Sequence, residues 1–261
     1  MTELDPREAY DRGYRYGEHF DSRADLNTDA AAVSSENRLE EYFDRHTTGP
    51  GIWKFRHYFE IYERHFEKLV GSEVHVVEIG VYSGGSLDMW KDYFGPACHV
   101  YGVDIRPECH AYERDGVRIF IGDQGDPSFW GDFAAQVPTV DVVIDDGSHS
   151  PEDQIVTLEA LLPHIRPGGV YLCEDVLHEG NAFHDYVNGL SRNLYRLDPR
   201  VPGRAREPSK FQRTVRSIHL YPYVTVIEKR AAPLESLRAP KQGTQWQPFF
   251  GRSPAPEGPV S

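Results

Sequence analysis

Three carboxylates and one histidine occur at a spacing that could bind a metal ion and transfer a proton. The chain contains Asp145-Asp146-Gly147-Ser148-His149, and Glu174-Asp175 begins 28 residues after Asp146. Each acidic segment ends a short apolar run, and the carboxyl ends of neighbouring parallel strands lie at one edge of a sheet. Carboxylates held this close raise one another's pKa unless a cation lies between them. Oxygen ligands favour Mg²⁺, Mn²⁺ or Ca²⁺ over zinc. We therefore predict a metal site formed by Asp146, Glu174 and Asp175. The alternative is that some of these acids cap helices or pair with arginine.

His149 is the candidate general base. It directly precedes a predicted helix start at Ser150-Pro151, so its backbone should be well ordered. A neutral imidazole, with an ordinary pKa of about 6.5, can accept the proton of a metal-bound hydroxyl near neutral pH. A single histidine is more often a polar residue at a pocket rim, but its position beside the carboxylates favours catalysis. We therefore assign His149 and Asp146 to catalysis, and expect Asp145 to support this loop or to contact a cofactor.

A glycine-rich turn forms the candidate cofactor site. An apolar run ending in Glu78-Ile79 leads into Gly80-Val81-Tyr82-Ser83-Gly84-Gly85-Ser86. Backbone N–H groups of such a turn can approach a ligand at the start of the next helix. A dinucleotide fold requires glycine where this chain has Tyr82, and Glu78 would face a pyrophosphate unfavourably. An acid there suits a cationic or amine-bearing ligand, and Glu78-x-Gly80-x-x-x-Gly84 resembles the first motif of class I S-adenosylmethionine-dependent methyltransferases.

Acidic and amide residues at the next two strand ends extend the predicted cofactor site. Asp104 lies 24 residues after Gly80 and is expected to accept hydrogen bonds from ribose hydroxyls. Nicotinamide-binding folds use the same acid, so Asp104 alone does not discriminate between the cofactors. Gly122-Asp123-Gln124 resembles the adenine-contacting segment. The predicted cofactor-binding residues are Glu78, Gly80, Tyr82, Ser83, Gly84, Ser86, Asp104, Asp123, Gln124 and Asp145.

The elements that position these residues follow a repeated strand–helix pattern. Apolar runs at 74–79, 100–104, 117–123, 140–146 and 170–175 alternate with helix-like segments, which predicts an α/β fold with a doubly wound, Rossmann-like sheet. Runs at 215–220 and 223–228 predict a closing antiparallel hairpin, for seven strands in all. Aromatic residues spaced by three and four predict an amphipathic helix over 53–70, with Phe55 on its buried stripe and Lys54 and Tyr58 on a solvated or interfacial face. Ser35 is expected to cap a shorter helix that ends near His46.

Composition and charge limit the class of protein. The 261 residues carry a net charge of −13, and 39% of them are hydrophobic. The acidic excess argues against a nucleic-acid partner. The sequence has no apolar run of roughly 18 residues, the length that could span a membrane. The start lacks the pattern of a signal peptide, and the three cysteines match neither a disulfide framework nor a zinc site. We expect a cytoplasmic protein without a nucleic-acid or membrane partner.

The chain is predicted to have three parts. Residues 1–70 form a helical cap or oligomerisation segment, 71–235 the cofactor-binding domain, and 236–261 a tail rich in proline and glycine. Tyr10 and Tyr14, four residues apart, are expected to dock the N-terminus on the body or on another subunit, with a lid over the site as the alternative use.

Three segments together resemble the metal-dependent O-methyltransferases of actinobacterial natural-product pathways, which methylate macrolide deoxysugars or rhamnose. These segments are 78–86, 145–149 and 174–175, and the similarity extends from about residue 53 to 195. The resemblance implies S-adenosylmethionine as donor, Mg²⁺ (or Mn²⁺) on Asp146, Glu174 and Asp175, and His149 as base. It also implies a homo-oligomer and a sugar hydroxyl of a natural product or nucleotide-sugar as acceptor. Methylation of a catechol-type diol and a non-catalytic, cofactor-binding regulatory role remain open alternatives.

Overall fold

The computed structural model describes residues 5–18, 37–178, 180–196, 207–238, 240 and 242, which form two separate units. Helix α1 (Pro6–Glu18) belongs to the first unit, and Tyr10 and Tyr14 are both exposed on it. The second unit begins at Asn37, so residues 37–70 belong to the same compact body as the sheet. Ser35 and most of the tail assigned to 236–261 lie outside the described residues. None of the helices in the described ranges is long and apolar enough to cross a membrane.

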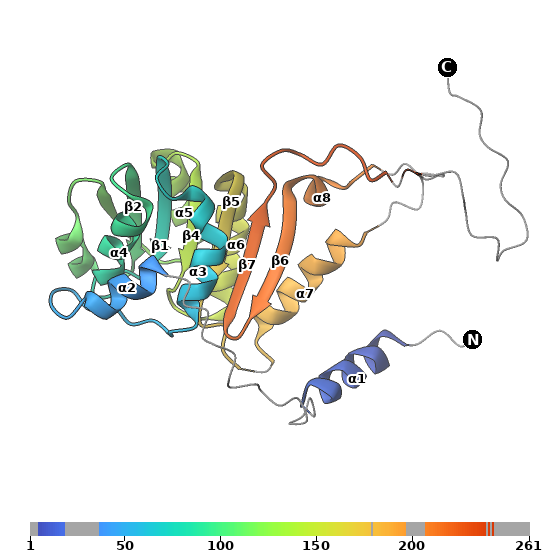
Figure 1. Ribbon diagram of the computed structural model, residues 1–261. Helices are drawn as coiled ribbons and strands as arrows, with labels where there is room; N and C mark the ends of the chain where they lie inside the picture. Colours follow the sequence, from blue (N-terminus) through green and yellow to red (C-terminus); the bar gives the residue numbers. More distant parts are fainter. Residues whose placement is uncertain are drawn as a thin grey trace, which may run out of the picture. The chain divides into compact units, whose positions relative to one another are not determined.

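A seven-stranded mixed sheet in the order β3-β2-β1-β4-β5-β7-β6 forms the centre of the second unit (Figure 1). Strands β1 to β5 are parallel, and β7 lies antiparallel between β5 and β6. This arrangement confirms the doubly wound, seven-stranded fold and its closing hairpin. The strands are β1 (Val74–Ile79), β2 (Cys98–Asp104), β3 (Val117–Ile121), β4 (Val140–Asp145), β5 (Ile165–Cys173), β6 (Val215–Tyr221) and β7 (Val224–Lys229).

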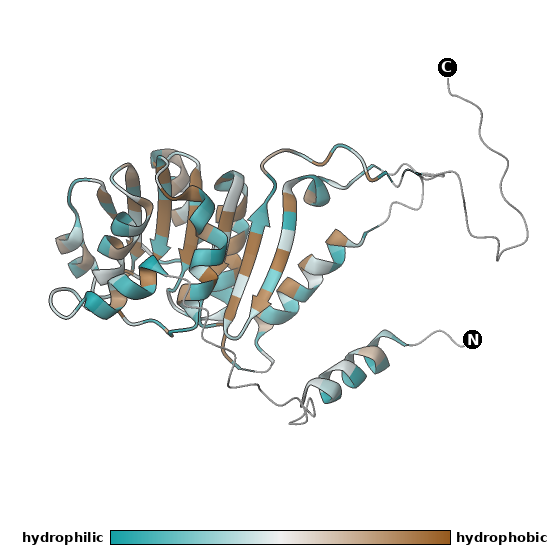
Figure 2. Ribbon diagram, viewed as in Figure 1, coloured by the Kyte–Doolittle hydropathy of each residue, from teal (hydrophilic) through white to brown (hydrophobic). Residues whose placement is uncertain are grey.

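Helices cover both faces of this sheet because its central strands bury side chains on both sides. In β1, Val74 and Val76 pack with α2, α3 and α4, whereas Val77 and Ile79 pack with α5, α6 and α7. Figure 2 shows the central strands as mostly hydrophobic, while the edge strand β6 alternates between hydrophobic and hydrophilic residues. The helices are α2 (Arg38–Arg45), α3 (Tyr58–Phe66), α4 (Gly85–Phe94), α5 (Pro127–Gln136), α6 (Pro151–His164), α7 (Ala182–Leu194) and α8 (Lys210–Thr214), with 3₁₀ turns η1 (Glu67–Leu69) and η2 (Pro107–Tyr112).

The segment before the sheet differs from the prediction. Helix α3 begins at Tyr58, not near Trp53, and Phe55 is 48% exposed although it was expected to be buried. Lys54 was expected on a solvated or interfacial face, but its side chain is only 3% exposed. The prediction failed because Lys54 lies in an irregular segment that carries its ammonium to buried carboxylates. The cap of α2 is Asn37, whose side chain accepts from the N–H groups of residues 39 and 40.

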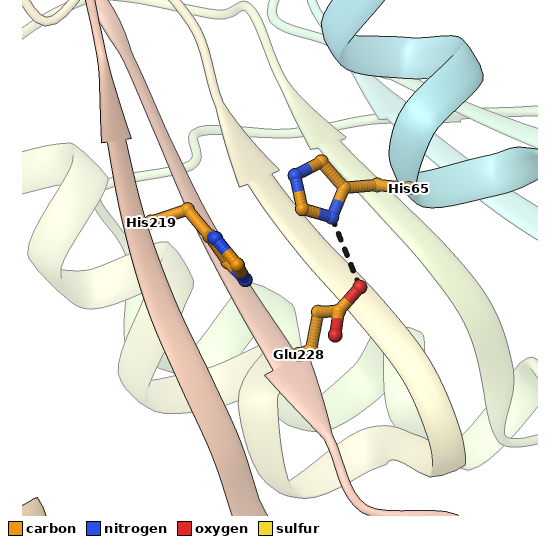
Figure 3. A group of neighbouring side chains, drawn as sticks. All are labelled: His65, His219 and Glu228. Atoms are coloured by element: carbon orange, nitrogen blue, oxygen red, sulfur yellow. Dashed lines mark hydrogen bonds and ion pairs between the residues drawn. The ribbon is translucent and has the colours of Figure 1, made fainter.

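Helix α3 is attached to the β6–β7 hairpin by a buried histidine (Figure 3). His65 Nδ1 lies 2.9 Å from Glu228 Oε1, and His65 Nε2 lies 3.0 Å from the Tyr221 hydroxyl. Ligand atoms of His65, His219 and Glu228 lie within 4.8 Å of one another, as in a metal site. However, both ring nitrogens of His65 already have partners, and the Lys68 ammonium lies 3.6 Å from Glu228. The cluster therefore balances its charge without an ion and serves to hold α3 on the sheet.

We expect Glu228→Gln to destabilise the fold in a pH-dependent way. The hydrogen bond from His65 lowers the pKa of Glu228 to about 2, below its ordinary value. The carboxylate thus stabilises the folded state above its unfolded pKa, and this contribution is lost as the pH falls from about 4.5 towards 2. Because Glu228 is partly solvated, we expect a loss of about 1–2 kcal/mol at pH 7 that shrinks on acidification. Urea unfolding at several pH values measures it, with the exposed Glu60→Gln on α3 as control; a pH-independent difference would contradict the assignment.

Candidate active site

A cavity of about 1010 Å³ opens at the carboxyl ends of the parallel strands. Most of the predicted site residues line it, which confirms that the loops after β1, β2, β3, β4 and β5 meet there. The lining residues from the predicted set are Gly80, Tyr82, Ser83, Ser86, Asp104, Asp123, Gln124, Asp146, His149, Glu174 and Asp175. Glu78, Gly84 and Asp145 are buried and do not belong to this lining.

The turn after β1 requires glycine at two positions. Gly80 has φ of +88°, and a Cβ there would overlap the backbone carbonyl of Asp146. Gly84 has φ of +74°, and a Cβ there would meet the ring of Tyr112. The first glycine therefore lets the loop after β1 touch the loop after β4. The second lets the chain enter α4 tightly, with the N-terminus of α4 beside the cavity.

Asp104 is held at the cavity wall by two backbone donors. Its Oδ2 accepts from the N–H of Tyr82 at 3.0 Å, and its Oδ1 accepts from the N–H of Arg106 at 2.8 Å. Tyr82 itself adopts a left-handed conformation with φ of 48°, and its side chain is exposed. The end of β2 and the glycine turn are thus connected through this carboxylate, which is also the group predicted to bind ribose hydroxyls.

Glu78 is fully buried under α4. It accepts hydrogen bonds from the Ser86 hydroxyl at 2.8 Å and from the Trp90 indole at 3.0 Å, and the Lys54 ammonium lies 3.9 Å away. Burial raises the pKa of Glu78, and Lys54 and the two donors oppose that effect. The carboxylate therefore anchors the first turns of α4 behind the cavity.

Asp145 and Gln124 connect the loop after β3 to the loop that carries the catalytic candidates. The Gln124 side chain donates to Asp145 Oδ1 at 3.1 Å and accepts from the N–H of Ser148 at 2.6 Å. The Tyr171 hydroxyl donates to Asp145 Oδ2 at 2.9 Å. Burial raises the pKa of Asp145 to about 7 despite these donors. Of the two roles expected for Asp145, support of the loop is the one these contacts provide.

The predicted metal-binding carboxylates lie at one wall of the cavity, but two of them already accept hydrogen bonds from a lysine side chain. Lys54 Nζ donates to Asp146 Oδ2 at 2.6 Å and to Glu174 Oε2 at 2.9 Å. Burial lowers the pKa of Lys54, but the surrounding carboxylates outweigh burial and raise it above its ordinary value, so Lys54 stays charged. Burial also raises the pKa of Glu174, an effect that Lys54 opposes.

Two tyrosines from α3 complete this cluster. The Tyr62 hydroxyl donates to Glu174 Oε1 at 2.6 Å, and the Tyr58 hydroxyl donates to Asp175 Oδ1 at 2.6 Å. Sequence reasoning missed Lys54, Tyr58 and Tyr62 as site residues. Tyr58 and Tyr62 are four residues apart, and residues at this spacing share a helix face. This spacing is a sequence signal from which the two tyrosines could have been predicted to point the same way. Lys54 precedes the helix, so helical spacing could not have located it.

His149 faces Asp175 across the mouth of the cluster. Its Nε2 lies 3.7 Å from Asp175 Oδ2, and φ at His149 is 57°. Among the described residues, His149 Nδ1 is one of few buried side-chain atoms without a hydrogen-bond partner. Asp146, His149 and Asp175 can each offer a ligand atom within 4.8 Å of the others. This group has His149 in place of the predicted Glu174, and its two carboxylates are the ligands that suit a hard divalent ion. An imidazole bound to the ion could not also accept a proton.

Comparison with known proteins places this geometry in context. Residues 77–176 match the family model of a methyltransferase domain. The chain is 35% identical to the mycinamicin VI 2''-O-methyltransferase of Micromonospora griseorubida, over 77% of this chain and 54% of that relative. It is also 35% identical to the 8-demethyl-8-alpha-L-rhamnosyl tetracenomycin-C 2'-O-methyltransferase of Streptomyces olivaceus, over 70% of this chain and 53% of that relative.

A solved structure shares this fold. The MycE methyltransferase from the mycinamycin biosynthetic pathway, in complex with Mg, SAH and mycinamycin VI, matches with a TM-score of 0.60 and 27% identity. The match covers 87% of this chain and 62% of that chain.

We expect Gly80→Ala to destabilise the protein by about 2 kcal/mol or more, because alanine is strained at this φ and its Cβ overlaps the Asp146 carbonyl. Gly131→Ala is the matched control. Gly131 lies within α5 with open space around its Cβ position, so alanine there should be neutral or stabilise by about 0.5–1 kcal/mol. Urea unfolding of both variants measures the difference. Equal stability of the two would contradict the contact between the loops after β1 and β4.

The chain spans about half the length of the curated relatives that it matches. The seven-stranded sheet agrees with the fold that the family resemblance implies. Residues 77–176 therefore form a methyltransferase domain of the class I fold, in a chain that resembles the actinobacterial sugar O-methyltransferases.

Proposed function

We propose that this chain is an S-adenosylmethionine-dependent, Mg²⁺-assisted O-methyltransferase that acts on a sugar hydroxyl of a natural product or nucleotide-sugar. The observation that carries the proposal is the cluster of Asp146, Glu174, Asp175 and His149 on the wall of the cavity that also contains the glycine turn. The names of its relatives, which are 2'-O- and 2''-O-methyltransferases of glycosylated compounds, support this choice of acceptor.

In this proposal the methyl donor lies along the glycine turn. Asp104 accepts hydrogen bonds from the ribose hydroxyls, while Asp123 and Gln124 lie beside the adenine. Glu78 acts indirectly, since it holds Ser86 and the start of α4 in place. The solved MycE structure contains SAH in a chain of the same fold, which supports a donor site in this cavity.

Asp146, Glu174 and Asp175 would hold the metal ion. When bound, the ion lowers the pKa of the acceptor hydroxyl and orients it. His149 accepts the proton of that hydroxyl, and the Asp175 carboxylate, 3.7 Å from Nε2, stabilises the imidazolium. The hydroxyl oxygen forms a bond to the methyl carbon while the carbon–sulfur bond breaks and sulfur retains the electron pair. The products are the methyl ether and S-adenosylhomocysteine.

Exposed aromatic residues at the cavity provide surfaces for a sugar ring or its aglycone. Trp53, Phe55 and Tyr82 line the cavity and are 85%, 48% and 72% exposed. The ring of Tyr223 lies 5.7 Å from that of Phe55 and extends this surface. Aromatic faces can pack against the C–H face of a sugar and can also stack on an aromatic diol, so this surface fits both candidate acceptors.

We also propose that the protein acts in the cytoplasm as a homo-oligomer. Its three cysteines are free and buried, as is usual in a reducing compartment. Light scattering after size-exclusion chromatography measures the oligomeric state, and a monomeric mass would refute this part.

A methyl-transfer assay tests the function. The protein is incubated with S-adenosylmethionine and Mg²⁺, with and without EDTA, and with a panel of rhamnosyl and deoxysugar glycosides, nucleotide-sugars and catechols. We expect a methylated glycoside or nucleotide-sugar by mass spectrometry, and no product with EDTA. Methylation of catechols alone would reverse the choice of acceptor. Cofactor binding without transfer to any member of the panel would favour a regulatory module.

His149→Ala should lower kcat by about 10²–10⁴-fold, as expected when a general base is lost. Because His149 lies at the carboxylate cluster and not at the turn, the affinity for S-adenosylhomocysteine should change less than about threefold. Stopped-time assays and isothermal titration calorimetry measure the two quantities. His184→Ala, at an exposed position in α7, is the control. Near-native turnover of His149→Ala would show that another group accepts the proton.

A further inference from the structure

Lys54 is an internal cation in the region where the family resemblance implies a metal ion. Its Nζ lies 2.6 Å from Asp146 Oδ2, 2.9 Å from Glu174 Oε2 and 3.9 Å from Glu78 Oε1. Its side chain is 3% exposed, so solvent does not screen these contacts. The ammonium therefore already compensates two of the three carboxylates that were predicted to bind the ion.

Both oxygens of Glu174 already accept a hydrogen bond from a side chain of the protein. Oε2 accepts from Lys54 and Oε1 accepts from the Tyr62 hydroxyl. A divalent ion that binds Oε2 would lie beside the Lys54 ammonium, and one that binds Oε1 would lie beside the Tyr62 hydroxyl. The ammonium is the group that would be repelled, because two cations on the same buried carboxylate repel each other strongly in a poorly solvated site. Tyr62 is neutral and can remain.

We propose that Lys54 and the divalent ion compete for Asp146 and Glu174. Lys54 holds the two carboxylates together in the metal-free protein and leaves them when the ion binds. This inference rests on the metal requirement of the proposed function. The apparent affinity of the protein for the metal ion is then lowered by competition from its own lysine.

The displacement would reach the acceptor side of the cavity. Lys54 belongs to an irregular segment that also contributes Ile52, Trp53 and Phe55 to the cavity wall. At one end this segment packs on the start of α4, where a Cβ on Gly85 would overlap the carbonyls of Pro50 and Gly51. At the other end α3 is held on the sheet through His65. Since both ends are fixed, the Lys54 side chain would move within a segment whose neighbours Trp53 and Phe55 also line the cavity.

The affinity for Mn²⁺ without donor or acceptor tests the competition. Electron paramagnetic resonance detects free Mn²⁺ and gives the dissociation constant for the wild-type protein, Lys54→Met and the control Lys68→Met. Lys68 is a half-exposed lysine of η1, away from the cavity. We expect Lys54→Met to bind Mn²⁺ at least tenfold more tightly than the wild type, and Lys68→Met to bind as the wild type does. Equal or weaker binding by Lys54→Met would overturn the proposal.

A second measurement needs no variant and so covers the case that Lys54→Met does not fold. Acetylation of the wild-type protein, followed by mass spectrometry, reports how accessible each lysine is. Lys54 should be protected without metal and should become reactive at saturating Mn²⁺, while the reactivity of Lys68 stays constant. Continued protection of Lys54 in the Mn²⁺-bound protein would refute displacement.

The two proposals fail in different ways. Absence of Mn²⁺ binding in both the wild type and Lys54→Met would overturn the metal requirement and the competition together. Metal-dependent methyl transfer by the wild type, without a gain in affinity in Lys54→Met, would overturn the competition alone. The double variant Lys54→Met/Glu174→Gln removes both charges and should lose the gain in affinity, because the oxygen that Lys54 releases is then no longer an anionic ligand.

Discussion

The pocket depends on one buried ammonium that joins carboxylates from two neighbouring strands. Asp146 follows β4, Glu174 follows β5, and Lys54 comes from a segment more than 90 residues earlier that contacts both. The buried Glu174 and the partly buried Asp146 would oppose folding without a counter-charge, since removal of one member of a buried ion pair costs about 3–5 kcal/mol. The same interaction therefore fixes the segment before α3 at the cavity wall and holds two of the three predicted metal ligands together.

The hydrogen-bonded register of the sheet brings the cofactor turn and the carboxylates together. Ile79 of β1 is paired with Asp145 of β4, and the N–H of Asp146 donates to the Ile79 carbonyl at 3.0 Å. On the other side, the N–H of Glu174 donates to the Asp145 carbonyl at 2.8 Å. Strands β1, β4 and β5 thus end side by side in one sheet, so displacement of the loop after β4 would affect the proposed donor site and the proposed metal ligands at the same time.

Much of this edge could be predicted because parallel strands impose it. Apolar runs that end in acids indicate both the strands and the side of the sheet where their side chains meet, which is why Asp104, Asp146 and Glu174 were found from sequence. The role of Glu78 was less accessible. Its position suggested a ligand contact, but its partners Ser86 and Trp90 come from the next helix, and only packing shows that they cover it.

Lys54 was not predictable for a different reason. An isolated lysine is usually solvated, and helical periodicity placed it on the outer face of a helix that in fact begins four residues later, at Tyr58. Its burial results from long-range electrostatics between Lys54 and acids about 90 and 120 residues away in the chain. Local pattern carries no information on such a contact, and the same limit applies to His65 and Glu228.

Backbone strain gives independent support for the location of the site. Among the described residues, five that are not glycine have positive φ, and Tyr82, His149 and Asp175 are three of them. All three line the cavity.

A residue other than glycine with positive φ costs of order 1–3 kcal/mol relative to relaxed backbone, and glycine would avoid most of that cost. Side chains at these positions must therefore contribute something that glycine cannot supply. For His149 and Asp175 the imidazole and carboxylate face each other, and for Tyr82 the backbone N–H is turned towards Asp104 while the ring remains at the cavity mouth. The strain thus falls on the residues whose orientation methyl transfer would require.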